Sequence, residues 1–170
     1  MPNIEIKAKC SNLNLAREVA LKLATECLGM DYQIDTYFHT LEGRLKLRES
    51  SLKGAYLIPY FRDNLSGPKK SQYTFLTSTE PELARELLGK ALGVSQVIDK
   101  MREIFLIDNV RVHLDQVKGL GTFIEFEAVY KVESKAAEEI EYQKVCLLMQ
   151  KFNIQEKDLL KESYRELSKS

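Results

Sequence analysis

Two runs of alternating residues flank a pair of glycines in the second half of the chain, at residues 111–117 and 121–127. Alternation with a period of two is typical of a β-strand, and glycines tolerate the positive φ of a tight hairpin turn. Successive side chains of a strand point to opposite faces of a sheet. This pattern predicts a hairpin with one apolar face and one charged face. The charged face carries Arg111, His113, Asp115, Glu125 and Glu127.

The three carboxylates on that face can be interpreted in two ways. A strand with charges on one side is most often half-buried, with its polar face in water. Glu125 and Glu127, however, repel each other two residues apart with no lysine between them, whereas a solvated face usually mixes signs. Converging carboxylates that stay charged favour a hard divalent cation. The other strands must decide between the two interpretations.

Length and composition narrow the class of protein. With 170 residues, the chain is expected to form one domain over residues 1–170. Lys and Arg number 25, as do Asp and Glu, so there is no basic excess for nonspecific binding to nucleic acid or a membrane surface. Cys10, Cys27 and Cys146 have no C-x-x-C spacing, which indicates free buried thiols. The chain has no apolar run of membrane length, so we expect a cytoplasmic protein.

Alternation predicts six further strands, within residues 3–10, 32–39, 44–49, 55–63, 72–76 and 97–106. Three amphipathic helices are also predicted. The first begins after Ser11 or Asn12 and ends at Gly29, and the second begins at 79–81 and ends before Gly93. The third is capped by Ser134 and continues to residue 152, and a short amphipathic turn follows at 159–167.

Eight strands joined by short links favour an antiparallel sheet that closes on itself, because closure removes exposed edges. If the apolar face pointed inward, the protein would be a lipocalin-like barrel for an apolar ligand. Three helices with apolar stripes need a surface to cover, and an apolar outer wall provides one. We therefore predict an α+β fold: an eight-stranded closed antiparallel β-barrel, or tunnel, with a charged lumen, clad by amphipathic helices.

Such a lumen would separate charges of opposite sign onto different strands. This separation suits a polyphosphate, because basic side chains bind its oxygens and carboxylates hold Mg²⁺ or Mn²⁺. The alternative is an internal salt-bridge network without a ligand. The predicted cations are Lys7, Lys9, Arg44, Lys46, Arg48, Arg62, Lys100, Arg102 and Arg111, and the predicted acids are Glu5, Asp115, Glu125 and Glu127.

Several motifs, in order along nearly the whole chain, resemble those of the CYTH family, which comprises class IV adenylyl cyclases and thiamine triphosphatases, the triphosphate tunnel metalloenzymes. They are Asn3-x-Glu5-x-Lys7, Gln33-x-Asp35-Thr36-Tyr37-Phe38, Gly43-Arg44-Leu45-Lys46-Leu47-Arg48-Glu49, Lys100-x-Arg102, His113-Leu114-Asp115-x-Val117-x-Gly119-Leu120-Gly121-x-Phe123-x-Glu125 and Ser163-Tyr164-Arg165. The resemblance is greatest to small prokaryotic class IV cyclase-like proteins. It implies an eight-stranded tunnel that binds a triphosphate through basic residues and a divalent metal through acids.

The resemblance also implies roles for individual residues. By the resemblance, the metal would be held by Glu5, Asp115 and Glu125, and the triphosphate by Lys7, Arg48, Lys100 and Arg102. The register of the strands adds Glu127 to the metal ligands, and Lys46, Arg62 and Arg111 to the triphosphate-binding residues. Glu5, Lys7, Asp115 and Glu125 are the expected catalytic residues. One position departs from the family signature Glu-x-Glu-x-Lys, because Asn3 stands where the first Glu would be. With one negative charge fewer, a second metal would be held more weakly or differently.

The expected function is that of a class IV adenylyl cyclase-like enzyme, which converts ATP to cyclic AMP and pyrophosphate. A triphosphatase acting on thiamine triphosphate or tripolyphosphate would need the same residues, and Asn3 motivates a third hypothesis, a catalytically weak triphosphate-binding module. We expect no nucleic-acid or membrane partner, and a homodimer is left open. His113, the cysteines and the aromatic residues Tyr37, Phe38 and Tyr60 are interpreted as structural rather than catalytic.

Overall fold

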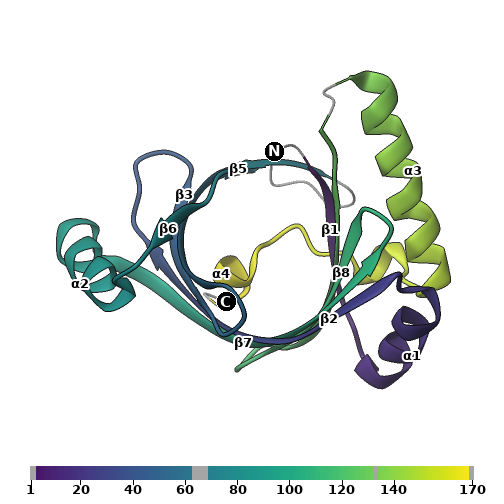
Figure 1. The fold of residues 1–170 in the computed structure, drawn as a ribbon, viewed down its shortest axis with the longest axis horizontal. Coiled ribbons are helices and arrows are strands. Elements are labelled where there is room, and N and C mark those ends of the chain that lie inside the picture. The colour runs from purple at the N-terminus through teal and green to yellow at the C-terminus, as the bar shows by residue number, and fades with distance from the viewer. Residues whose placement is uncertain (1–2, 63–68, 132–133, 169–170) are drawn as a thin grey trace.

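An antiparallel sheet dominates the computed structural model, which describes residues 3–62, 69–131 and 134–168 (Figure 1). Nine strands lie within these residues. The strands are β1 Asn3–Lys9, β2 Glu26–Phe38, β3 Arg44–Ser50, β4 Gly54–Arg62, β5 Lys69–Tyr73, β6 Leu76–Ser78, β7 Val94–Ile107, β8 Val110–Val117 and β9 Gly121–Val129. The helices are α1 Leu13–Leu23, α2 Pro81–Leu92, α3 Lys135–Lys151 and α4 Tyr164–Leu167, with a 3₁₀ turn at Glu156–Asp158. The predicted α+β fold with an antiparallel sheet is confirmed.

The strands are arranged around the middle of the molecule, with α4 inside and α1, α2 and α3 outside (Figure 1). Their order is β3-β2-β7-β8-β9-β1-β5-β4-β6, and β3 also pairs with β4. Each of the eight predicted strands has a counterpart. The additional strand arises because the predicted strand at 72–76 is divided between β5 and β6.

The hairpin of β8 and β9 forms as predicted. His113 is opposite Glu125, and Arg111 is opposite Glu127. Gly119 and Gly121 adopt φ values of 77° and 108°, which the turn requires and which other residues rarely adopt.

The apolar face of this hairpin points outward, toward α1 and α3. Val112 and Phe126 are fully buried there against Ala20 of α1 and Val145 of α3. Asn12 and Ser134 cap these two helices by accepting hydrogen bonds from backbone amides in the first turn. Two of the predicted helices therefore cover the apolar wall, and the charged faces of the strands point inward.

The other helix differs from expectation. None of the twelve residues of α2 is buried, and Leu83 and Leu87 of its predicted apolar stripe are 45% and 54% exposed. In α1, likewise, Ala16 and Ala20 are buried, whereas Leu15 is 58% exposed. Apolar periodicity identified the helices correctly and placed Ala16 and Leu23 of α1 against the core, but Leu15, Leu83 and Leu87 do not pack on the sheet.

The first helix is also shorter than predicted. It ends at Leu23, and the chain is already in β2 at Glu26, opposite Leu106 of β7. The pairing of β2 with β7 overrides the helical spacing that continued to Cys27. The three cysteines are free, but Cys27 is exposed and the other two are half-buried, so the prediction of buried thiols was wrong.

None of the described helices is long and apolar enough to span a membrane.

Candidate active site

A cavity of about 340 Å³ lies between the inward faces of the strands. It brings together most of the predicted site residues. Those that line it are Glu5, Lys7, Lys46, Arg48, Lys100, Arg102, Arg111, Glu125 and Glu127. Two residues predicted for the site are not among the described lining. Asp115 is fully buried and contacts Arg102 and Tyr164, and the side chain of Arg62, at the end of β4, lies outside the described part of the structure. Two other cations expected in the lumen, Lys9 and Arg44, are also absent from the described lining: Lys9 is exposed at the end of β1, and Arg44 pairs with Glu166.

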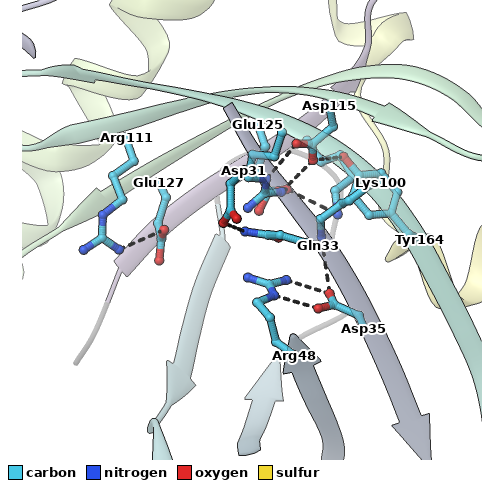
Figure 2. A network of polar contacts seen from close by, with 12 residues as sticks. Asp31, Gln33, Asp35, Arg48, Lys100, Arg111, Asp115, Glu125, Glu127 and Tyr164 are labelled. Atoms are coloured by element: carbon cyan, nitrogen blue, oxygen red, sulfur yellow. Dashed lines mark hydrogen bonds and ion pairs between the residues drawn. The ribbon is translucent and has the colours of Figure 1, made fainter. Parts of the chain in front are cut away.

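Asp35 of β2 holds three of the cations in place, and Figure 2 labels two of them, Arg48 and Lys100. Its carboxylate, 1% exposed, accepts two hydrogen bonds of 2.6 Å from Arg48, one of 2.9 Å from Lys46 and one of 3.3 Å from Lys100. The two basic strands β3 and β7 flank β2, so one acid reaches cations from both sides. Burial alone would raise the pKa of Asp35, but these cations hold it well below its usual value.

Burial makes the charged form of both lysines in this cluster less favourable. Burial and the nearby Arg48 guanidinium lower the pKa of Lys46 to about 8, although Asp35 opposes the shift. Burial also lowers the pKa of Lys100 well below its usual value, against the attraction of Asp35. Such desolvated cations are stabilised by an additional anion.

Arg102 of β7 is fixed by two acids. Its guanidinium donates two hydrogen bonds to Asp115, of 2.7 and 2.6 Å, and one of 3.0 Å to Glu125. Asp115 also accepts a hydrogen bond of 2.7 Å from the hydroxyl of Tyr164 (Figure 2). Burial would raise the pKa of Asp115, but Arg102 keeps it lowered. Both carboxylate oxygens of Asp115 are therefore engaged by protein donors.

Glu125 and His113 occupy neighbouring strands in the middle of the wall. Glu125 lies 3.7 Å from the ammonium of Lys7, which is directly opposite it on β1. His113 is 5% exposed, and burial and Arg102 lower its pKa to about 3. The imidazole is therefore neutral near pH 7, and its Nδ1 has no hydrogen-bond partner among the described residues.

The acids Glu5 and Glu127 face each other across β1 and β9. Residues opposite in this register have Cβ atoms roughly 5 Å apart. Glu127 accepts a hydrogen bond of 2.8 Å from the amide of Asn3 and forms an ion pair of 3.3 Å with Arg111. Asn3, where the family signature has Glu, thus donates to a neighbouring carboxylate.

These acids partly fit the predicted Mg²⁺ or Mn²⁺. The described residues contain no group of three His, Cys, Asp or Glu side chains that could hold a metal by themselves. Mg²⁺, however, commonly takes one or two carboxylates from the protein and its other ligands from water and substrate phosphates. Glu5, Glu125 and Glu127 line the cavity and suit that role, whereas the oxygens of Asp115 are directed to Arg102 and Tyr164.

Sequence reasoning missed four residues of this site. Asp35 and Tyr164 form the contacts described above, and Asp31 accepts hydrogen bonds from Gln33 and Ser50 at 2.6 and 2.8 Å. Asp31, Gln33 and Asp35 are spaced two residues apart and therefore share one face of β2. Alternation along this strand could have identified all three. Tyr164 had only its place in the Ser-Tyr-Arg motif.

The sequence profile of the CYTH domain matches residues 1–164. A candidate adenylate cyclase of Methanocaldococcus jannaschii is 24% identical over 174 residues, covering 98% of both chains. The structure of a candidate adenylate cyclase from Vibrio parahaemolyticus has a TM-score of 0.79 at 21% identity, covering 99% of this chain and 98% of that one. A candidate adenylyl cyclase from Hippeastrum, described as revealing a dominant triphosphatase activity, has a TM-score of 0.57 at 13% identity, covering 95% and 91%.

Proposed function

The chain belongs to the CYTH domain family, and from that premise we propose that it is a metal-dependent enzyme that acts on a triphosphate bound in the cavity. We favour the class IV adenylyl cyclase reaction. The relative from Methanocaldococcus jannaschii and the structural neighbour from Vibrio parahaemolyticus are each named as a candidate adenylate cyclase.

One observation carries the proposal: basic side chains from four strands, β1, β3, β7 and β8, converge on one cavity. Among the described residues that line it, seven are Lys or Arg and four are Asp or Glu. Lys7, Lys100 and Arg102 are buried, and placing cations together in a buried site is costly, as the lowered pKa values of Lys46 and Lys100 indicate. A triphosphate supplies several negative oxygens that would compensate them, and the guanidinium groups of Arg48 and Arg102 have further N–H donors beside those that contact Asp35, Asp115 and Glu125.

We further propose that the strands work as a tunnel around this ligand. In support, β3 pairs with β2 on one side and with β4 on the other, and β4 continues through β5 to β1. The cavity lined by these inward faces would exclude much of the bulk water, which strengthens charge interactions with the bound phosphates.

The metal would be held by Glu5, Glu125 and Glu127, with Asp115 as a fourth predicted ligand. A divalent cation supplies neutralisation of charge on phosphate oxygens in this kind of reaction. The contacts of Asp115 favour a different contribution for this residue, because it orients Arg102 toward the cavity. Lys7, Lys46, Lys100 and the arginines would bind and orient the phosphate chain. Arg62 and Arg111 remain predicted members of that set.

In the cyclase reaction, the ribose 3′-hydroxyl of ATP attacks the α-phosphorus. The new P–O bond closes the ring of cyclic AMP, the bond to the bridging oxygen breaks, pyrophosphate leaves and the hydroxyl proton is released. The cations that bind the β- and γ-phosphates would stabilise the charge that develops on this leaving group.

A triphosphatase is the second candidate. It is favoured by the structural neighbour from Hippeastrum, which is described as having dominant triphosphatase activity. Water would then attack the terminal phosphorus of thiamine triphosphate or tripolyphosphate, and the bond from this phosphorus to the bridging oxygen would break. Thiamine diphosphate or pyrophosphate would leave, the attacked group would become inorganic phosphate, and a proton would be released. The same cations and acids would serve both reactions.

Product analysis separates these functions. The purified chain is incubated with Mg²⁺ or Mn²⁺ and ATP, thiamine triphosphate or tripolyphosphate. Cyclic AMP with pyrophosphate supports the cyclase, and free phosphate supports the triphosphatase. Thermal stabilisation by these ligands without turnover supports a binding module instead, and no response to any of them supports the internal salt-bridge network.

Glu125→Gln tests the acidic residues directly. We expect it to abolish metal-dependent turnover while the circular dichroism spectrum stays unchanged. Glu103→Gln is a matched control, because Glu103 pairs at 2.6 Å with Arg17 of α1 and is not part of the cavity lining. Unchanged rates in Glu125→Gln would refute the metal assignment.

A further inference from the structure

The short helix α4 lies among the strands and contributes to the cavity wall (Figure 1). Glu166 ties it down in two ways: its carboxylate accepts a hydrogen bond of 2.6 Å from Arg44 of β3, and it caps the helix by accepting from the backbone amide of Ser163 at 2.7 Å. The helix therefore sits at a defined place beside the basic residues.

Tyr164 is the residue of α4 that reaches those basic residues. It is 3% exposed and packs against Phe123, with 5.0 Å between the ring centroids. The ammonium of Lys7 lies 3.9 Å from the centre of the tyrosine ring, and that of Lys100 lies 5.4 Å from it. Both distances are within the range of cation–π attraction.

The hydroxyl of Tyr164 reaches a third cation indirectly. It donates a hydrogen bond of 2.7 Å to Asp115, whose two oxygens hold the guanidinium of Arg102 (Figure 2). Burial and the charge of Asp115 raise the pKa of Tyr164 well above its usual value, so the hydroxyl stays protonated and keeps donating. One side chain thus contacts two cations of the cavity and supports the orientation of another.

We infer that Tyr164 is a positioning residue for triphosphate binding: it fixes Lys7 and Lys100 through its ring, and Arg102 through Asp115, before the ligand arrives. The inference rests on the proposed function. Lysine side chains lose considerable rotamer freedom when a ligand immobilises them. A ring that already restricts two of them reduces this entropy cost and so increases affinity.

The inference predicts an order of affinities for inorganic tripolyphosphate, measured by calorimetry without metal. Tyr164→Phe keeps the ring but loses the hydrogen bond to Asp115, and we expect a loss of roughly two- to fivefold. Tyr164→Leu loses both, and we expect a loss on the order of tenfold or more, because cation–π contacts with desolvated ammonium groups are lost as well.

Phe126→Leu is the matched control for lost packing. Phe126 is fully buried and packs on Phe152 on the outer, helix-covered face, away from the cavity. Phe126→Leu should lower the unfolding temperature, as Tyr164→Leu does, but leave the affinity for tripolyphosphate unchanged.

A double-mutant cycle with Lys7→Met tests whether the ring acts through the lysine. We expect Lys7→Met to weaken binding less in the Tyr164→Leu background than in the wild type. Additive losses would overturn the positioning role, as would wild-type affinity in Tyr164→Leu or an equal loss in Phe126→Leu. If the wild type itself binds no triphosphate, the proposed function fails, which is a different outcome from binding that does not depend on Tyr164.

Discussion

Replacing Asp35 with asparagine should destabilise the folded chain severely and make its stability depend on a bound anion. The carboxylate contacts Arg48, Lys46 and Lys100 at 2.6 to 3.3 Å and is only 1% exposed. Asparagine is nearly isosteric, so little packing changes, but three buried cations lose their counter-charge. Removing one partner of a buried ion pair costs roughly 3–5 kcal/mol. For a chain of this length that corresponds to a fall of roughly 6–20 °C in the unfolding temperature.

Thermal unfolding at pH 7, with and without tripolyphosphate, measures both parts of this prediction. The effect is fully expressed at that pH, because the pKa of Asp35 is held well below its usual value and its contribution is lost only as the pH falls toward that lowered pKa. Tripolyphosphate should raise the unfolding temperature of Asp35→Asn more than that of the wild type, because the ligand replaces the missing negative charge.

The control for this experiment is Glu86→Gln. Glu86 pairs at 2.5 Å with Lys90 on α2, but its side chain is 58% exposed, and exposed pairs of this kind contribute less than about 0.5 kcal/mol. An Asp35→Asn variant that unfolds within two or three degrees of the wild type, or that gains no extra stabilisation from tripolyphosphate, would refute the reasoning.

Two further predictions concern single side chains. Because the pKa of Lys46 is about 8, triphosphate binding at pH 8 should raise this pKa, and the protein should take up a fraction of a proton. Calorimetry in buffers of different ionisation enthalpy measures this proton uptake. The uptake should be smaller at pH 6.5 and in Lys46→Met. Equal uptake in wild type and Lys46→Met would contradict the assignment. Asn3→Glu replaces a hydrogen-bond donor to Glu127 with a second carboxylate. Without metal, we expect the free energy of unfolding to fall by about 1.5–3 kcal/mol. Mn²⁺ should stabilise this variant more than it stabilises the wild type. Unfolding temperatures that do not respond differently to Mn²⁺ would count against it.

The sequence predicted the inward-facing residues well, because alternation along a strand is a local property. Lys100 and Arg102 on β7, and Glu125 and Glu127 on β9, all line the cavity as their spacing indicated. Alternation could not predict which acidic side chain contacts which basic side chain. The contacts of Asp35 with Arg48 and Lys100 join residues 13 and 65 positions apart, and they depend on β2 lying between β3 and β7.

The contacts of Tyr164 could not be predicted from alternation either. Its hydrogen bond to Asp115 spans 49 positions and requires the chain to return to the interior after α3. Helix boundaries failed for a related reason. The spacing of apolar residues up to Cys27 suited a helix, but the backbone there pairs with β7, and a tertiary contact outweighed local preference.

The most direct test of the central claim is a calorimetric titration of tripolyphosphate into the metal-free chain, compared with Arg48→Met. Arg48 lines the cavity and has further N–H donors beside those that contact Asp35, but it is not among the proposed metal-holding residues. The account predicts one tripolyphosphate bound per chain and a loss of at least about tenfold in affinity in the variant. A wild type that binds no tripolyphosphate, or that binds it equally well without Arg48, would contradict it.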